Sequence, residues 1–466
     1  MTSPSDDTLV QFPKNTLYKD IASHQWPIIY CKNYNIGFLR LEKLHLFDSS
    51  KWGSIISYLR DANMITDDTI IRPNEATKEH LRLVHTQRYL SSLKWSAQVA
   101  RVLEVAPIAM LPNFIVQWRV LKPLRYQTGG TILLRFSHDR NTLYRDIASH
   151  QWPIIYCKNY NIGFLRLEKL HPFDSSKWGS IINYLRNANM ITDDTIIRPN
   201  EATKEHLRLV HTQRYLSSLR WSAQVARVLE VAPIAMLPNF IVQWRVLKPL
   251  RYQTGGTILA GKLALERGWA INIGGGFHHC SSDSGGGFCA YADLTLLIKN
   301  LFIYYSERIK KVLIVDLDAH QGNGHEHDFM NDERVFIMDM YNRQIYPRDQ
   351  HAKTAIKCKI ELMNHTDDKT YLRLLHINLE KSLKEFQPDF VVYNAGTDIL
   401  EGDLLGNLDI TPEGVIIRDE IVFSKCIRER NIPIVMCTSG GYQRTNARVI
   451  ADSILNLNRK KLISCE

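Results

Sequence analysis

The chain has 466 residues, of which 45% are hydrophobic, 23% charged and 10% aromatic. This composition is typical of a globular protein with a large core, and it excludes a disordered chain, a collagen and a coiled coil. The net charge of +10 is poor evidence for a nucleic-acid partner, because most of it comes from a repeat within the chain.

The chain shows no sign of export or of membrane insertion. No stretch approaches the roughly 20 apolar residues that a bilayer span requires. Acidic residues stand near the start, where a signal peptide would be basic and then apolar. The eight cysteines show no CxxC spacing, which argues against a disulfide framework. We therefore expect a soluble intracellular protein with reduced thiols and no membrane span.

A long internal repeat decides the organisation of the chain. Residues 15–133 recur at 141–259 with five differences, and the first copy carries 15 Lys and Arg against 9 Asp and Glu. Without this copy the net charge falls from +10 to +4. Such near-identity indicates a recent duplication or an error in the gene model, because solenoid repeats are far less alike. The differing pairs are Lys19 and Arg145, Leu46 and Pro172, Ser57 and Asn183, Asp61 and Asn187, and Lys94 and Arg220.

The repeat divides the chain into four segments. Residues 1–14 form a polar tail, 15–133 a partial duplicate, 134–140 a junction, and 141–466 the catalytic domain. The partial duplicate ends before every candidate site residue, so we expect it to be catalytically silent. Both copies contain the same strand-forming segment, so either could supply that strand to a sheet formed with the rest of the chain. The second copy is directly continuous with residues 260–466, and this continuity favours it modestly.

From the second copy onward, short β-rich runs alternate with amphipathic stretches. This alternation predicts an α/β fold with a mainly parallel sheet and helices on both faces. Ligands bind such sheets at the carboxyl ends of the strands. The expected strands are 152–156, 269–275, 312–318, 335–341, 390–396 and 432–441, and expected helices include 292–309 and 371–386.

Two of these strand ends carry possible metal ligands. Asp316, Asp318 and His320 follow each other at every second position, which on a strand points them to one side. Neighbouring carboxylates resist burial unless a cation or a proton lies between them. The alternative is a polar strand end with a helix cap. Together with Asp398, the pair Asp318 and His320 would leave one position open, as catalytic zinc sites do.

Two further strand ends offer groups for proton transfer and for oxyanion binding. His278 and His279 follow three glycines, and Tyr442 follows two. Taken alone, the histidines predict structural or surface groups and the tyrosine a half-buried side chain. Beside a metal, imidazoles can take a proton from water, and a phenol can donate to a developing oxyanion.

The motifs GGGFHHCSSDSGGGFCAYAD, DLDAHQGNGHE, NAGTDILEGD and SGGYQR occur in this order. They resemble the zinc-dependent histone deacetylase family, and within it class IV, from about residue 141 to near the end of the chain. The resemblance implies the arginase-deacetylase α/β fold with an eight-stranded, mainly parallel sheet. It also implies a narrow acyl tunnel and hydrolysis of N-acyl-lysine amides in proteins.

The resemblance assigns a role to each matching position. The implied zinc ligands are Asp318, His320 and Asp398; the acid and base are His278 and His279, with Asp316 as carboxylate partner; the oxyanion donor is Tyr442. The implied tunnel residues are Gly287, Phe288 and Tyr346, and the implied ligands of a structural K⁺ are Asp316 and Asp339.

Asn323 departs from the pattern of many deacetylases, which have an Asp at this position. An Asn cannot stabilise an imidazolium by charge, so we expect His279 to be less basic than in those relatives. Class IV sequences share this Asn, so it argues for a subclass.

The resemblance implies further expectations and leaves two rivals. It implies acylated lysines of histones or other proteins as substrates, other deacetylases or transcription corepressors as partners, and a location in the nucleus and cytoplasm. Class IV implies long fatty acyl groups, and the small residues at 281–288 would suit a roomy channel. A two-metal ureohydrolase is disfavoured, since Gly322 and Leu400 stand where it needs carboxylates. The other rival is an inactive interaction module in which the duplication prevents folding.

Overall fold

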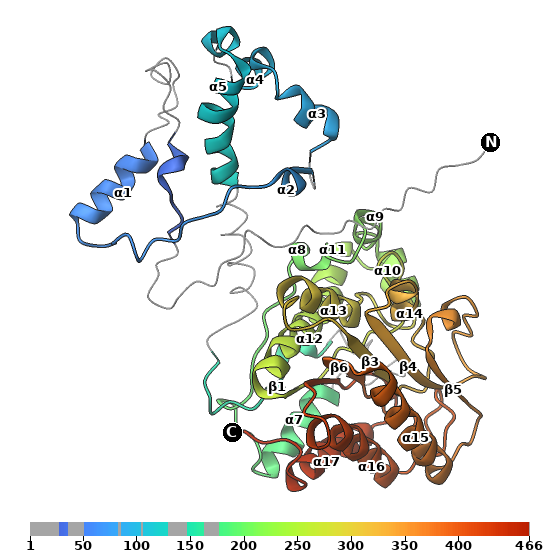
Figure 1. Ribbon diagram of the computed structural model, residues 1–466. Helices are drawn as coiled ribbons and strands as arrows, with labels where there is room; N and C mark the ends of the chain where they lie inside the picture. Colours follow the sequence, from blue (N-terminus) through green and yellow to red (C-terminus); the bar gives the residue numbers. More distant parts are fainter. Residues whose placement is uncertain are drawn as a thin grey trace, which may run out of the picture. The chain divides into compact units, whose positions relative to one another are not determined.

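The computed structural model describes residues 28–35, 51–82, 85–103, 106–128, 147–162 and 177–465 (Figure 1). The expected polar tail and junction lie outside these residues. The chain divides into two compact units, Met1–Thr142 and Leu143–Glu466. The second unit contains the sheet and every candidate site residue.

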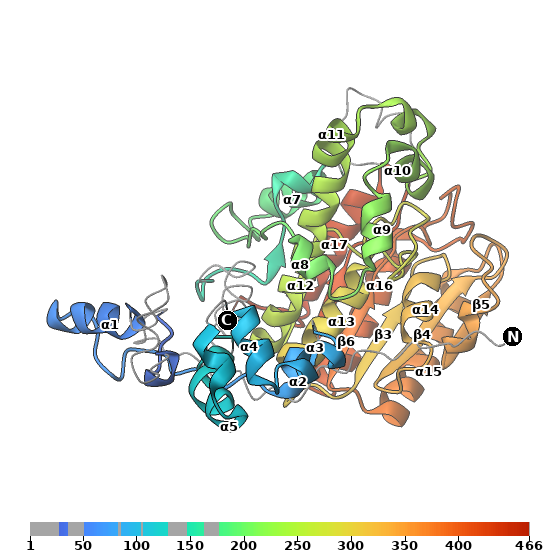
Figure 2. The ribbon, with the colours of Figure 1, turned by 90° about the horizontal axis from the view of Figure 1, so that it is seen from above.

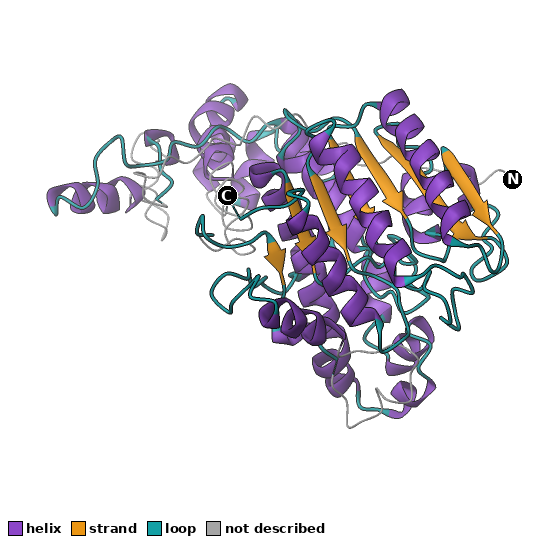
Figure 3. Ribbon diagram, turned by 90° about the horizontal axis from the view of Figure 1, so that it is seen from below, coloured by secondary structure: helices purple, strands orange, loops and turns teal. Residues whose placement is uncertain are grey.

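The sheet of the second unit is entirely parallel, with the order β1-β2-β7-β6-β3-β4-β5 (Figure 3). The α/β fold class is confirmed, and all six expected runs form strands. The seventh strand, β5, is an edge strand with charged residues at alternate positions, which hid it from a search for apolar runs. The strands are β1 (Ile154–Ile155), β2 (Trp269–Asn272), β3 (Val312–Asp316), β4 (Val335–Asn342), β5 (Cys358–Leu362), β6 (Phe390–Asn394) and β7 (Ile434–Cys437).

The described residues form seven strands, where the resemblance implied eight. Beyond β1, Ile197 makes a single parallel bridge with Ile155. Its N–H donates to the oxygen of Ile154 at 3.0 Å. Pro199 stands two residues later and has no N–H to continue such a ladder. The eighth place in the sheet is thus held by one bridge.

Alternate side chains of each central strand enter two different cores. On β3, Leu313 and Val315 face one core, and Val312 and Ile314 face the other. The first core is covered by α7 (Lys177–Asn187), α15 (Asp368–Phe386), α16 (Pro412–Phe423) and α17 (Asn446–Arg459). The second is covered by α12 (Lys248–Arg267), α13 (Asp293–Tyr304) and α14 (Asn323–Phe329).

A group of short helices forms a third core beside the sheet. We call residues 203–247 the helical arm; its α10 and α11 lie next to each other, away from the strands (Figure 2). Its apolar side chains pack on Phe277, Cys280 and Cys289. The arm contains α8 (Lys204–Leu207), α9 (Gln213–Ser218), α10 (Ser222–Val228), the 3-10 helix η7 (Ala232–Met236), α11 (Asn239–Val242) and the π-helical turn η8 (Gln243–Leu247).

The first unit repeats these local elements without the sheet. Its apolar side chains form two small clusters, one around Ile56 and one around Val99. Residues 77–121 are the counterpart of the helical arm, and we call them the first arm. Among its described residues, the helices of the unit are η1 (Lys32–Tyr34), α1 (Lys51–Asp61), α2 (Lys78–Arg82), α3 (Gln87–Ser92), α4 (Ser96–Val102), η3 (Ala106–Met110), α5 (Asn113–Val116) and η4 (Gln117–Leu121).

Candidate active site

The candidate site residues gather at the carboxyl edge of the sheet. Asp316 ends β3, with Asp318 and His320 just beyond it, and Asp398 lies just after the neighbouring strand β6. The segments after β2 and β7 bring in the histidine pair and Tyr442. The parallel order therefore places groups that are 164 positions apart in the chain, from 278 to 442, at one end of the sheet.

Asp318, His320 and Asp398 form a compact cluster of possible metal ligands. Each offers one ligand atom, and these atoms lie within 4.8 Å of one another. Nδ1 of His320 is 3.1 Å from Oδ1 of Asp318 and 2.9 Å from Oδ2 of Asp398. All three side chains are buried, so the cluster places two carboxylates side by side where water cannot solvate their charge.

The ionisation of this cluster fits a cation. Burial and the charge of Asp318 raise the pKa of Asp398 to about 7. Burial alone would lower the pKa of His320, but its hydrogen bonds to Asp318 and Asp398 raise this pKa to about 10. The positive charge of protonated His320 thus offsets part of the negative charge of Asp318 and Asp398. A divalent cation bound by the three residues would replace this proton. Carboxylate oxygens and imidazole nitrogens both bind zinc, and three protein ligands leave a fourth position open, as catalytic zinc sites do.

His278 belongs to a second buried cluster behind the first. Its Nδ1 lies 2.9 Å from Oδ2 of Asp316, and Nε2 of His325 approaches the same oxygen at 2.8 Å. Asp316 also accepts a hydrogen bond from the Asn394 side chain at 2.9 Å. Burial lowers the pKa of His278, but Asp316 and Asp318 outweigh it and raise this pKa to about 9.

His325 was not predicted from the sequence. Together with His278 and Asp316 it forms a second group whose atoms are close enough to hold a metal. Both histidines direct a ring nitrogen at one carboxylate oxygen, which is how hydrogen-bond donors share an acceptor. Its signal in the sequence was a histidine five residues after His320, at the start of a helix.

His279 has a neutral partner instead of a carboxylate. Its Nδ1 lies 2.8 Å from Oδ1 of Asn323. Burial and the neighbouring imidazoles of His278 and His320 hold the pKa of His279 well below its usual range. When Nδ1 donates to Asn323, the other nitrogen of the ring carries a lone pair.

Tyr442 is positioned by the loop after β7. Its backbone N–H donates to Asp403 at 2.9 Å, and its ring centroid lies 6.4 Å from that of His320. Gly440 N–H donates to Asp318 at 3.2 Å. Burial and the charges of Asp398 and Asp318 raise the pKa of Tyr442 well above its usual range, so the phenol stays protonated and can donate.

The three expected tunnel residues flank the site. The Phe288 ring lies 5.9 Å from the Tyr442 ring, and the half-exposed Tyr346 ring lies 5.0 Å from that of His279. Gly287 has a φ of 51°, and a Cβ there would come within 2.3 Å of the His279 ring. The absence of a side chain at Gly287 thus allows this loop to pack closely on His279.

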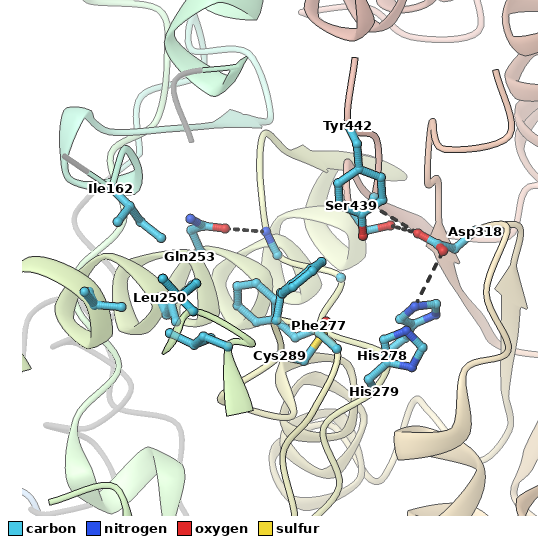
Figure 4. A pocket seen from close by; sticks show the side chains of 18 of the residues that line it. Ile162, Leu250, Gln253, Phe277, His278, His279, Cys289, Asp318, Ser439 and Tyr442 are labelled. Atoms are coloured by element: carbon cyan, nitrogen blue, oxygen red, sulfur yellow. Dashed lines mark hydrogen bonds and ion pairs between the residues drawn. The ribbon is translucent and has the colours of Figure 1, made fainter. Parts of the chain in front are cut away.

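An apolar cavity with about 130 Å³ of space accessible to the centre of a water molecule reaches these groups. One end is lined by His278, His279, Asp318 and Tyr442 (Figure 4). The other end is apolar and is built by the helical arm and α12, through Leu229, Val231, Ile234, Val246 and Leu250. The second copy of the repeat thus supplies the apolar wall, which sequence reasoning did not foresee.

Asp339 lies beside Asp316, because the two residues are partners in the register of β3 and β4. Burial and the charges of Asp316 and Glu326 raise the pKa of Asp339 well above its usual range. Its Oδ2 accepts a hydrogen bond from Gly322 N–H at 2.9 Å.

Lys177 is a further residue that the sequence did not single out. It is fully buried at the start of α7, and its Nζ donates to the oxygens of Ser439, Gly440 and Gly441. These three residues lead directly to Tyr442. The ammonium therefore ties the second copy of the repeat to the loop that carries the phenol.

Comparisons with known proteins show the family and the fold of the chain. The model of the histone deacetylase domain matches residues 171–457. Histone deacetylase 2 of Arabidopsis thaliana is 56% identical over 321 residues, which cover 69% of this chain and 82% of that protein. The crystal structure of the HDA15 HD domain is 20% identical with a TM-score of 0.53, covering 66% of this chain and 88% of that one. A histone deacetylase homologue in complex with SAHA is 22% identical with a TM-score of 0.51, covering 66% and 83%.

A polar site at the carboxyl edge of a parallel sheet, open to an apolar cavity, defines an enzyme of the α/β class. The chain belongs to the histone deacetylase family. It is accordingly a hydrolase that acts on amides, with acetylated proteins as its class of substrate. Among the described residues, no helix has both the length and the apolar character needed to cross a membrane.

Proposed function

We propose that the chain hydrolyses N-acyl-lysine amides in proteins with the help of one zinc ion. The observation that carries the proposal is the convergence of Asp318, His320 and Asp398 beside the histidine pair and Tyr442, at the end of an apolar cavity. Asp318, His320 and Asp398 would hold the ion. When bound, zinc supplies Lewis-acid chemistry, since it polarises carbonyl groups and makes water more acidic.

The surrounding residues provide the remaining chemistry. His279 is held neutral by burial, so its free nitrogen accepts a proton from water and passes it to the departing lysine amine. His278, held by Asp316, keeps a positive charge beside the reacting amide. The protonated phenol of Tyr442 donates to the oxyanion that forms on the acyl carbon. Every group thus has one role that its hydrogen bonds support.

We further propose that the acyl group is long. The support is the apolar end of the cavity, whose walls Leu229, Ile234 and Leu250 offer apolar surface that a long alkyl chain can cover and an acetyl methyl cannot. Each buried CH₂ of an acyl chain contributes about 0.8 kcal/mol. A side-by-side assay of acetyl-lysine and myristoyl-lysine peptides tests this, with faster hydrolysis of the myristoyl peptide expected. Equal or faster hydrolysis of the acetyl peptide would contradict it.

Substitutions separate metal binding from catalysis. Asp318→Ala or His320→Ala should abolish zinc binding, measured by metal analysis of the purified protein. Tyr442→Phe should keep zinc but lose about 2.7 to 4 kcal/mol of transition-state stabilisation, the scale for one oxyanion donor. His279→Ala should lower the rate and keep zinc. Loss of zinc from the His279 variant would make it a ligand, and unchanged turnover of Tyr442→Phe would remove its role.

A structural K⁺ at Asp316 and Asp339 is a separate proposal. Asp316 already accepts from His278, His325 and Asn394, so backbone oxygens would have to contribute most of the ligands. Thermal unfolding in KCl and in tetramethylammonium chloride tests it, with a higher midpoint expected in KCl.

A further inference from the structure

Four large apolar side chains protrude from the helical arm. Each of these side chains is between 57% and 84% exposed, although large apolar side chains are usually buried in a packed protein. We call this set the apolar patch, and it consists of Trp221, Met236, Phe240 and Trp244.

Hydrogen bonds within the arm hold the patch together. Ser222 donates to the oxygen of Leu237 at 2.8 Å, and Gln243 donates to the oxygen of Leu219 at 2.8 Å. The first bond joins the start of α10 to the loop before α11, and the second joins the first residue of η8, directly after α11, to the loop before α10. Trp221 is therefore fixed beside the helix that carries Phe240.

The charge around the apolar patch is mainly positive. Arg220, Arg227 and Arg245 are exposed, and among the described residues none of them forms an ion pair. Glu230 is the only acidic residue between positions 213 and 252. The guanidinium of Arg245 lies over the Trp244 ring, 3.9 Å from its centroid. Exposed tryptophan and phenylalanine flanked by arginine are the side chains that prefer the boundary between lipid headgroups and acyl chains.

The same patch occurs a second time in the chain. In the first arm, Trp95, Met110, Phe114 and Trp118 are between 58% and 89% exposed. Arg119 lies over the Trp118 ring at 4.2 Å, as Arg245 does over Trp244. The sheet-bearing unit and the first unit give these side chains different surroundings, and both leave them uncovered. The exposure of these side chains is thus a property of the arm itself. Within each unit, the described residues do not cover them.

The inner side of the same helices lines the cavity. Val231 and Ile234 lie between Trp221 and Met236 in the sequence, and Val246 stands two residues after Trp244. A surface bound by the patch would therefore lie against the helices that form the apolar end of the cavity. Long acyl chains partition into bilayers, so this surface would hold acylated lysines close to the cavity.

We propose that the apolar patch and its arginines bind an anionic lipid surface, and that the two arms of one chain bind it together. The headgroup charge attracts the arginines, while the aromatic side chains enter the boundary with the acyl chains. Two linked sites raise the overall affinity without any new contact. The access of acylated lysines rests on the proposed function, whereas lipid binding does not.

Vesicle sedimentation of the full chain tests the proposal. Vesicles of phosphatidylcholine with about 30% phosphatidylserine should bind the chain at least about tenfold more tightly than pure phosphatidylcholine, and salt should weaken this binding. The double substitution Phe240→Ser and Trp244→Ser should lower the affinity by about tenfold, and the matched pair Phe114→Ser and Trp118→Ser by a similar factor. All four together should abolish binding.

Hydrolysis of a soluble acetyl-lysine peptide serves as the folding control, and it should not change, because these side chains do not line the cavity. Absence of binding by the unmodified chain, or equal binding by the fourfold variant, would overturn the proposal. A shift of the fourfold variant to a smaller assembly in gel filtration, with no effect on vesicles, would assign the patch to a protein partner instead. Because vesicle binding needs no catalysis, its failure is distinct from failure of the deacylase assay.

Discussion

The two copies of the repeat have nearly the same sequence, but different neighbours cover their apolar side chains. Helix α1 of the first copy and α7 of the second bury Ile56 and Ile182 alike. In contrast, Ile55 is 47% exposed, whereas Ile181 is fully buried, because α7 also packs against α17 and the sheet. The residues of α1 and α7 are thus sufficient to form the helix, whereas burial of its apolar side chains requires residues from elsewhere in the chain.

Backbone hydrogen bonds show the same difference between the two copies. Ile71 donates to Ile28 at 2.9 Å, as Ile197 does to Ile154 at 3.0 Å. The second copy alone continues into a sheet, because β1 pairs with β2. A parallel strand of this kind needs neighbours and covering helices, and residues 269–441 supply one such place.

The largest expected difference between the copies concerns Ile181 and Ile55. Ile181→Ala removes a fully buried side chain and should destabilise the second unit by about 2 to 5 kcal/mol. Ile55→Ala changes a half-exposed position and should cost less than about 1 kcal/mol. Denaturant unfolding measures both costs, followed by enzymatic activity for Ile181→Ala and by limited proteolysis within the first unit for Ile55→Ala. Equal costs would mean that the two helices have similar surroundings.

A second pair differs in its response to pH. His211 is buried, donates from Nδ1 to Ser282 at 3.1 Å and accepts from Ala292 N–H at 3.0 Å, so it has no room for a second proton. Burial lowers its pKa to about 4. An unfolded histidine binds its proton near pH 6.5. Stability should therefore fall as the pH drops from about 6.5 to 4, by at most about 3 kcal/mol.

His211→Gln should flatten this pH dependence, since the amide can make the same two bonds without titrating. The matched change His85→Gln is at an exposed position of the first copy and should leave the dependence as it is. Thermal unfolding between pH 7 and pH 4, at constant ionic strength, compares the two. An unchanged slope in the His211 variant would contradict the account.

The third pair connects the repeat to catalysis. Lys177→Met removes the ammonium donor from the backbone oxygens of Ser439 and Gly441, while that of Gly440 keeps its hydrogen bonds from Thr397. The loss of this donor costs about 1 to 3 kcal/mol. We expect turnover to fall by roughly 10- to 100-fold with zinc retained, because the loop loses its position. Lys51→Met, the same change in the first copy, should have no effect on turnover. The reverse pattern would show that the first copy fills the sheet.

Sequence patterns were sufficient to locate the sheet's central strands along the chain and the polar groups at their ends, but not the order of the strands in the sheet. Apolar runs such as 312–318 are long and are followed by polar residues, so both the strand and its polar end were evident. The cluster of Asp318, His320 and Asp398 was predicted from carboxylates that cannot be buried alone.

Other features depend on contacts between distant segments and left no local pattern. Lys177 is charged and begins a helix, which is typical of an exposed residue, and only the fold brings it to Ser439. The apolar wall of the cavity comes from the helical arm, whose short helices carry no chemical motif. The place of His325 in the site is evident only from the fold, which brings its Nε2 to 2.8 Å from Oδ2 of Asp316.

The central claim is that the second unit alone carries the active site and that the first copy is catalytically silent. The most direct measurement compares the full chain with a chain that begins at Thr142, by zinc content and by the rate of acyl-lysine peptide hydrolysis per molecule. We expect one zinc per molecule and the same specific activity in both, with better solubility of the shorter chain, since it lacks exposed side chains such as Ile55 and Tyr58. Loss of activity in the shorter chain, while the full chain is active, would show that the first copy is a working part of the fold.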